Sequence, residues 1–135
     1  MRYEVSGEVA AAPETVWSVL MDVERWPEWT ESVRAVRLLT PGPLAVGSEV
    51  RLTQPRLRPA TWRVTRLEPL QSFAWTSTSG GVRSVADHRL TPLADNRVRV
   101  DLSIEQSGAL APLIGLLFGG LIRRYLRMES DGLAR

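Results

Sequence analysis

The sequence predicts an α+β fold in which an antiparallel sheet is covered on one face by a long C-terminal helix. Apolar and polar side chains alternate over residues 97–106, as they do in a strand with one buried and one solvated face. A second alternating segment, residues 3–9, is followed at once by a short helical pattern that starts at a proline. Apolar residues at helical spacing then run from Leu110 to Met128 and supply the cover.

The segment Ala11–Thr30 predicts two short helices after the first strand. Pro13 suits the first turn of a helix, where a missing N–H costs little, and Pro27 ends this stretch or starts a new short turn. Three of the five tryptophans, Trp17, Trp26 and Trp29, lie here. We expect them to anchor the short helices on the sheet and to shape one end of a cavity.

Five further strands are predicted between these outer elements, at residues 32–40, 49–54, 61–68, 72–77 and 82–90. Turn residues separate them, among them Pro41-Gly42-Pro43, Gly80-Gly81 and Asp95-Asn96. The sheet should therefore contain about seven strands. A chain of 135 residues has the length of one domain, so we expect a single domain over residues 1–135.

The composition excludes several classes of function. The chain has no cysteine, which removes disulfides and thiol catalysis, and it has no lysine to form a Schiff base. A single histidine and no close group of acidic residues predict neither a metal site nor another cofactor. The 17 arginines are dispersed, which argues against nucleic-acid binding, and the longest apolar run is too short to span a membrane. Without a signal-peptide pattern, we expect a cytoplasmic protein.

Several motifs together resemble those of a known family. They are Ala12-Pro13-Glu14-Thr15-Val16-Trp17, residues 22–29, residues 47–52, Trp62-Arg63-Val64, Phe73-Ala74-Trp75 and residues 88–92. The chain is similar over essentially its whole length to the polyketide cyclase/dehydrase and lipid-transport group of the START/Bet v 1-like (SRPBCC) superfamily. The resemblance implies a helix-grip fold, in which a curved sheet wraps around the long C-terminal helix. Because the superfamily includes cyclases, hydrolases, lipid carriers and hormone receptors, the fold alone does not choose a function.

The inward faces of the strands and of the C-terminal helix predict the lining of a pocket. Val50 and Leu52 place Gln54 inward, where it is either a polar anchor for a ligand or simply a strand-end residue. The aromatic side chains either stack on a flat ligand or form core. The full set of predicted ligand-binding residues is Leu52, Gln54, Trp62, Phe73, Trp75, His88, Leu90, Leu117, Leu121 and Tyr125.

His88 is the only histidine, so a general base of the ordinary kind at neutral pH is either His88 or a carboxylate with a raised pKa. Its neighbour Asp87 should point to the opposite face of the sheet, so the two cannot form an orienting pair. Three interpretations remain open for His88: a buried strand residue with local hydrogen bonds, a pocket residue without catalysis, and a catalytic base.

Three functional hypotheses follow. The first is a protein that binds a small hydrophobic or aromatic ligand without catalysis, as an inward apolar pattern with few polar groups suggests. The second is a cyclase or dehydratase that acts on a polyketide-like substrate in the same cavity, with proton transfer at His88. The third is an interaction protein that uses the C-terminal helix to form a homodimer or to dock on a partner; a monomer remains equally open.

Overall fold

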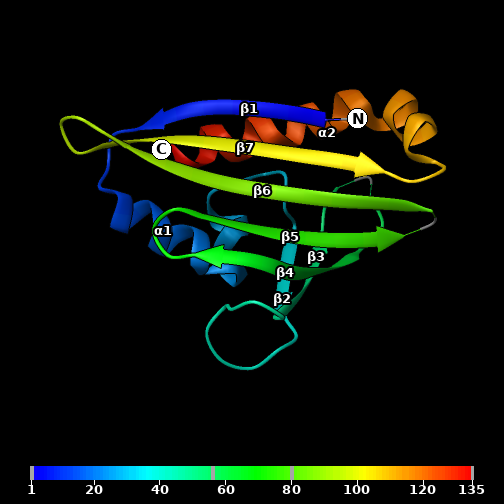
Figure 1. The fold of residues 1–135 in the computed structure, drawn as a ribbon, viewed down its shortest axis with the longest axis horizontal. Helices are drawn as coiled ribbons and strands as arrows, with labels where there is room; N and C mark the ends of the chain where they lie inside the picture. Colours follow the sequence, from blue (N-terminus) through cyan, green and yellow to red (C-terminus); the bar gives the residue numbers. More distant parts are fainter. Residues whose placement is uncertain (1, 56, 80, 135) are drawn as a thin grey trace.

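The computed structural model describes residues 2–55, 57–79 and 81–134, apart from the side chains of residue 79 and residues 113–118. One antiparallel sheet has the strand order β1-β7-β6-β5-β4-β3-β2 (Figure 1). The predicted α+β class, with a seven-stranded antiparallel sheet, a long C-terminal helix and two short helices after the first strand, is confirmed. The elements are β1 (Arg2–Val9), α1 (Pro13–Met21), the 3-10 helix η1 (Val23–Glu28), β2 (Ala35–Leu38), β3 (Glu49–Thr53), β4 (Ala60–Glu68), β5 (Ser72–Ser79), β6 (Val82–Leu93), β7 (Arg97–Ser107) and α2 (Ala111–Leu133).

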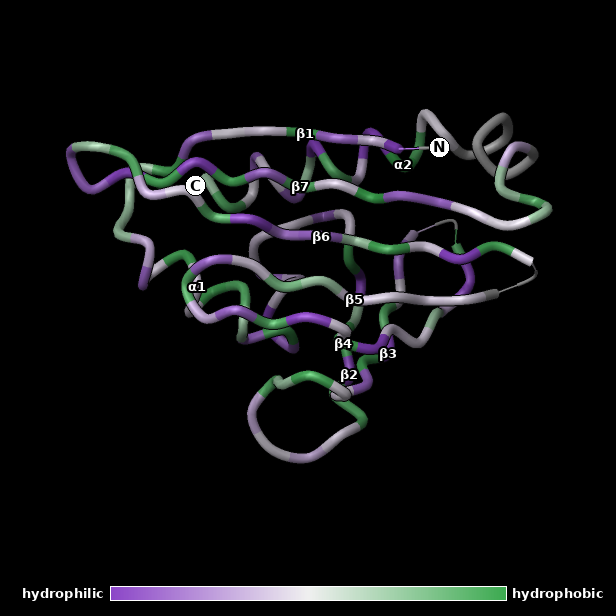
Figure 2. Tube along the Cα trace, viewed as in Figure 1, coloured by the Kyte–Doolittle hydropathy of each residue, from purple (hydrophilic) through white to green (hydrophobic). Residues whose placement is uncertain are grey.

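All helices lie on one face of the sheet, behind it in Figure 1. The sequence of the strands explains why the helices cover only one face, because hydrophobic and hydrophilic stretches alternate along β6 and β7 (Figure 2). In β7 the side chains of Val98, Val100 and Leu102 are fully buried, whereas Arg97, which precedes them, and Arg99, between Val98 and Val100, are exposed. Burial of one strand face removes apolar area from water at about 25 cal/mol per Å², so this face drives the packing of the helices.

Two strands differ most from the sequence-based prediction, and the other strand boundaries shift by at most two residues. The predicted strand at 32–40 pairs only over Ala35–Leu38, because its first part is a turn in which the buried hydroxyls of Thr30 and Ser32 bond each other at 2.8 Å. The strand predicted at 82–90 continues to Leu93. Proline has no N–H for a ladder, yet Pro92 still pairs opposite Val98, next to the hairpin turn that follows.

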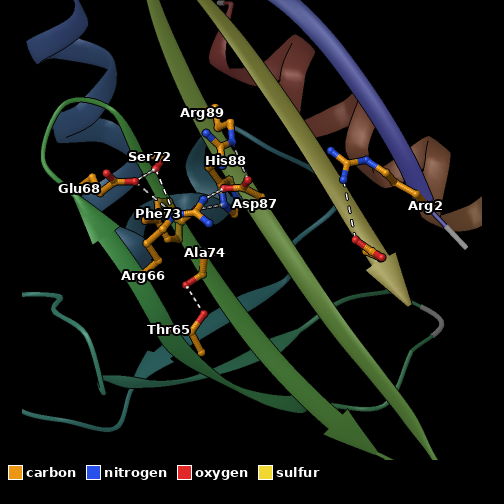
Figure 3. A network of polar contacts seen from close by, with 11 residues as sticks. Arg2, Thr65, Arg66, Glu68, Ser72, Phe73, Ala74, Asp87, His88 and Arg89 are labelled. Atoms are coloured by element: carbon orange, nitrogen blue, oxygen red, sulfur yellow. Dashed lines mark hydrogen bonds and ion pairs between the residues drawn. The ribbon is translucent and has the colours of Figure 1, made fainter. Parts of the chain in front are cut away.

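A β-bulge in β4 bends the sheet. The register between β4 and β5 shifts between Val64 and Arg66, so Thr65 is the extra residue, and its hydroxyl donates to the carbonyl of Ala74 at 3.3 Å. A bulge increases the local twist of a strand and reverses the alternation of side chains beyond it. Arg66 therefore lies on the outer face of the sheet, away from the helices (Figure 3).

Two glycines let the C-terminal end of α2 pack closely on its neighbours. A Cβ on Gly7 of β1 would lie 2.6 Å from the hydroxyl oxygen of Ser130, and a Cβ on Gly132 would collide with the carbonyl oxygen of Trp29. Any side chain at these positions would push the helix away from the sheet or from the end of η1. The close approach fixes the last turns of α2, including Glu129, relative to the sheet.

Candidate functional site

A cavity of about 780 Å³ lies between the inner face of the sheet and α2. Strands β3 to β7 form one wall and the loop between β3 and β4 contributes Gln54 and Leu57. The opposite wall comes from α2, through Ile122, Tyr125, Leu126 and Glu129. The volume falls within the range of about 300–1,000 Å³ that is usual for small-molecule pockets.

The structure brings most of the predicted ligand-binding residues together. Leu52, Gln54, Trp62, Trp75, His88 and Tyr125 line the cavity. Phe73 and Leu90 are buried, but the described lining does not include them, and the half-buried Leu121 is likewise outside it. The side chain of Leu117 lies outside the described residues. Direct contact of any of these residues with a ligand stays a prediction.

His88 is held by polar contacts at both ring nitrogens. Its Nε2 lies 3.1 Å from Oε1 of Glu129 on α2, and its Nδ1 lies 3.4 Å from the carbonyl oxygen of Phe73 on β5. Both side chains are largely buried, with exposed fractions of 4% for His88 and 11% for Glu129. Both nitrogens therefore face oxygen acceptors, and a neutral imidazole can donate to only one of them. The carboxylate of Glu129 and the carbonyl of Phe73 together orient the ring.

Aromatic side chains enclose the same imidazole ring. Phe73 stacks on it with a centroid distance of 4.1 Å and an interplanar angle of 3°. Trp26 and Trp75 meet it at steep angles, at 5.6 and 5.8 Å. Trp26 is itself fixed, because its indole N–H donates to the carbonyl of Leu20 at 3.1 Å. Packing on several sides holds His88 in one orientation at the cavity wall.

Sequence reasoning missed Glu129, as well as the lining residues Ser84 and Gln106. Glu129 lies 41 positions from its partner His88, so no local spacing joins them. A signal was present, however: Glu129 follows Tyr125 by four residues, which places a carboxylate within the buried stripe of α2. Trp26 was expected to be structural and to shape one end of a cavity; it packs in the core and also lines the cavity.

Asp87, the neighbour of His88, points away from the cavity, as strand alternation predicts. On the outer face its carboxylate accepts hydrogen bonds from Nη2 of Arg66 and, at 2.8 Å, from Nε of Arg89 (Figure 3). The network continues through Arg66 to Glu68 at 3.4 Å. These groups support the sheet from outside and contribute no side chain to His88.

Tyr125 joins the two walls of the cavity. Its hydroxyl donates a hydrogen bond to the carbonyl oxygen of Pro55, in the loop between β3 and β4. The side chain is buried and lines the cavity, so its ring faces the interior while its hydroxyl is already used. We infer that Tyr125 presents apolar surface, rather than a free hydroxyl, to whatever the cavity holds.

The described residues contain neither a cluster of metal ligands nor a helix that could cross a membrane. No three His, Cys, Asp or Glu side chains in residues 2–55, 57–79 and 81–134 gather closely enough to hold a metal ion. Within those same ranges, no helix combines the length and the apolar character needed to cross a membrane.

The fold is similar to that of several solved structures. The Zhui aromatase/cyclase from Streptomyces sp. R1128 superposes with a TM-score of 0.80 at 20% identity, covering 99% of this chain and 91% of that one. A START superfamily protein from Mycobacterium smegmatis gives 0.76 at 17%, covering 98% and 96%. The di-domain ARO/CYC BexL from the BE-7585A biosynthetic pathway gives 0.78 at 15%, covering 99% of this chain and 45% of that one. At these identities the likeness establishes the helix-grip fold alone.

Comparison at the sequence level identifies the family. None of the curated proteins is similar enough in sequence to match. The model of one family does match, over residues 1–135, which is the whole chain, and that family is described as polyketide cyclase/dehydrase and lipid transport. This chain therefore belongs to the polyketide cyclase/dehydrase and lipid-transport family.

Proposed function

We propose that the protein binds a small hydrophobic molecule with an aromatic body in the cavity between the sheet and α2. The observation that carries this proposal is the lining of the cavity of about 780 Å³: 15 of its 27 residues are apolar or aromatic, and the polar ones include His88, Gln106 and Glu129. Ligand pockets have this composition, because apolar area supplies affinity and a small number of polar groups fixes orientation. Trp62 and Trp75 line the cavity with their ring centroids 6.1 Å apart, and their rings offer surface to a flat molecule.

A cavity-filling variant tests this function. Ala86 lies in the lining, on the inner face of β6, so Ala86→Phe places a ring inside the cavity. We expect binding of 1-anilinonaphthalene-8-sulfonate, followed by its fluorescence, to weaken at least about tenfold, a loss of about 1.4 kcal/mol. The matched control is Ala94→Phe, at an exposed position outside the cavity, which should leave binding unchanged. Equal binding by wild type and Ala86→Phe would place the probe elsewhere and refute the proposal.

A second candidate function is catalysis of a cyclisation or dehydration in the same cavity. The observation that favours it is the pair formed by His88 and Glu129 at the cavity wall, 3.1 Å apart. For His88 to remove a proton beside a carbonyl group of a bound molecule, one ring nitrogen must first leave its contact with Glu129 or with the carbonyl of Phe73. In an aldol cyclisation the resulting carbanion attacks a second carbonyl carbon of the same chain, and the proton passes to the new alkoxide. The aromatase/cyclase named among the similar folds makes a polyketide-like substrate the one to test.

Two variants separate catalysis from binding. His88→Gln keeps a polar side chain of similar size but cannot act as a base, so it should abolish turnover of a poly-β-keto thioester analogue while binding of the naphthalene probe remains. Glu129→Gln keeps a hydrogen-bonding group near Nε2 of His88. Its turnover should therefore lie between that of the wild type and that of His88→Gln. If His88→Gln turns over the analogue as fast as the wild type, His88 is not the base and the catalytic proposal fails.

A further inference from the structure

The register of the sheet arranges the inward-facing side chains of β5, β6 and β7 in three parallel rows. Each row crosses the three strands, and neighbouring rows lie two residues apart along each strand. The rows are Phe73-His88-Leu102, Trp75-Ala86-Ile104 and Ser77-Ser84-Gln106. The first contains His88, the second is apolar, and the third is polar at every position. The inner face of the sheet therefore has polar groups at two levels with an apolar band between them.

The polar row extends into β4 through Trp62. Arg63 pairs with Thr76, which places Trp62 opposite Ser77. We use the term polar row for Trp62, Ser77, Ser84 and Gln106, all of which line the cavity. Within it, Nε2 of Gln106 donates to the hydroxyl of Ser84 at 3.3 Å.

Trp62 carries a donor that the protein leaves unused. Its side chain is more than nine-tenths buried, and its Nε1 has no hydrogen-bond acceptor among the described residues. A buried N–H without a partner is destabilising, and an acceptor on a bound molecule would remove that cost. Trp62 lines the cavity next to Ser77, so a carbonyl or hydroxyl oxygen that enters between these two side chains could accept the hydrogen bond of Nε1 and also contact the hydroxyl of Ser77.

The two polar levels are far enough apart to contact opposite ends of one molecule. Ser84 and His88 lie four residues apart on β6, and a strand rises about 3.3 Å per residue, so the separation is about 13 Å. Ala86 lies midway, with Trp75 beside it. Its small side chain leaves space at the centre of the band, where a flat ring system would lie against Trp75.

We infer that the polar row is a second anchoring subsite, which binds an oxygen-bearing end of the ligand opposite the His88 end. The ligand is then an elongated aromatic molecule with hydroxyl or carbonyl oxygens at both ends, about 13 Å apart. This inference rests on the proposed binding function and adds the substitution pattern of the ligand. It assigns specificity to Trp62 and Ser77, whereas the carboxylate of Glu129, beside His88, is the polar group at the other end.

Three probes of one shape test the inference: trans-stilbene, 4-hydroxystilbene and 4,4′-dihydroxystilbene. The monohydroxy probe can place its oxygen at one level only, and the dihydroxy probe can reach both. In the wild type, titration followed by fluorescence should show 4,4′-dihydroxystilbene binding about tenfold more tightly than 4-hydroxystilbene, the gain expected of one hydrogen bond in a desolvated site. In Trp62→Phe, which keeps a ring but removes the N–H, that ratio should fall to about two or less.

Matched variants complete the test. Trp29→Phe is the control, because Nε1 of Trp29 also has no acceptor among the described residues but Trp29 does not contribute to the described lining of this cavity; it should keep the tenfold ratio. Ser77→Ala and Ser84→Ala remove the hydroxyls one at a time and keep the measurement available if Trp62→Phe does not fold. Each should reduce the ratio.

The two proposals fail in different ways. If all three stilbenes bind the wild type equally, or if Trp62→Phe and both serine variants keep the tenfold ratio, the second subsite is refuted while binding in the cavity stands. If none of the three binds, and Ala86→Phe does not alter binding of the naphthalene probe, the proposed function itself is refuted.

Discussion

Asp87 and His88 are adjacent in β6, yet they form two very different polar pairs. Asp87 lies on the outer face between Arg66 and Arg89, whose side chains are 38% and 58% exposed. His88 lies on the inner face against Glu129, with exposed fractions of 4% and 11%. The outer groups can return to water if a partner is lost, whereas the inner groups cannot. Similar hydrogen bonds therefore differ in consequence because of what surrounds them.

The difference shows which pair the fold is built to hold. The outer pair depends on long, flexible arginine side chains that lose rotamer freedom when they are ordered. The inner pair is held by aromatic packing around the imidazole and by the close contact of α2 with β1 at Gly7. Rigid placement of polar groups is what binding and catalytic sites require.

The largest expected effect comes from removing the ring that stacks on His88. Phe73 is fully buried, and Phe73→Ala should lower the free energy of unfolding by about 3–5 kcal/mol, since it leaves a cavity and frees the imidazole. Urea denaturation measures it. Phe73→Leu, which conserves most of the volume, should cost about 1.5 kcal/mol or less. A loss below 1 kcal/mol for Phe73→Ala would mean that packing does not hold the inner pair.

The next largest effect should distinguish the inner pair, His88 and Glu129, from the outer group around Asp87. Glu129→Ala leaves the buried Nε2 of His88 without its carboxylate partner and should cost about 1–3 kcal/mol in the free energy of unfolding. Asp87→Ala should cost less than about 1 kcal/mol, because Arg66 and Arg89 can be rehydrated. Equal losses in the two variants, measured under the same denaturant conditions, would remove the distinction between the faces.

The smallest effect is expected at a fully solvated pair, Arg25 and Glu28 of η1. The hydrogen bond that Arg25 donates to Glu28, 2.8 Å long, lowers the pKa of this carboxyl below its ordinary value. Its stabilisation is therefore present above the ordinary pKa of a glutamate and is lost as pH falls through the lowered value. In Arg25→Gln the pKa of Glu28, followed by carbon NMR, should rise towards the ordinary value, while the melting temperature at pH 7 should not change measurably. An unchanged pKa would show that the pair does not persist in solution.

Much of the fold could be predicted because its signals are local. The alternation in β7 and the proline that starts α1 depend on neighbouring residues, and both predictions match the structure. The placement of Asp87 outside and His88 inside followed from the same alternation. Local patterns also have limits: the bulge at Thr65 and the short span of β2 arise from hydrogen bonds that no residue spacing reveals.

The site was less predictable because its members come from distant parts of the chain. Glu129 reaches His88 only because the close packing at Gly7 and Gly132 fixes the end of α2. The polar row depends in turn on the register of four strands, which alternation alone does not determine. Candidate residues such as Trp62 and Trp75 could be named from the sequence, but their neighbours could not.

Glu24 of η1 covers part of an edge of the sheet. The strand β2 is an edge of the sheet, where unpaired backbone groups can recruit another chain. Its Leu38 N–H, however, is bonded at 3.3 Å by the carboxylate of Glu24, and β2 is only four residues long. A neighbouring molecule that tried to add a strand here would have to displace Glu24 and would gain few hydrogen bonds. We therefore expect η1, whose Trp26 lines the cavity, also to hinder the addition of a strand from another molecule at β2.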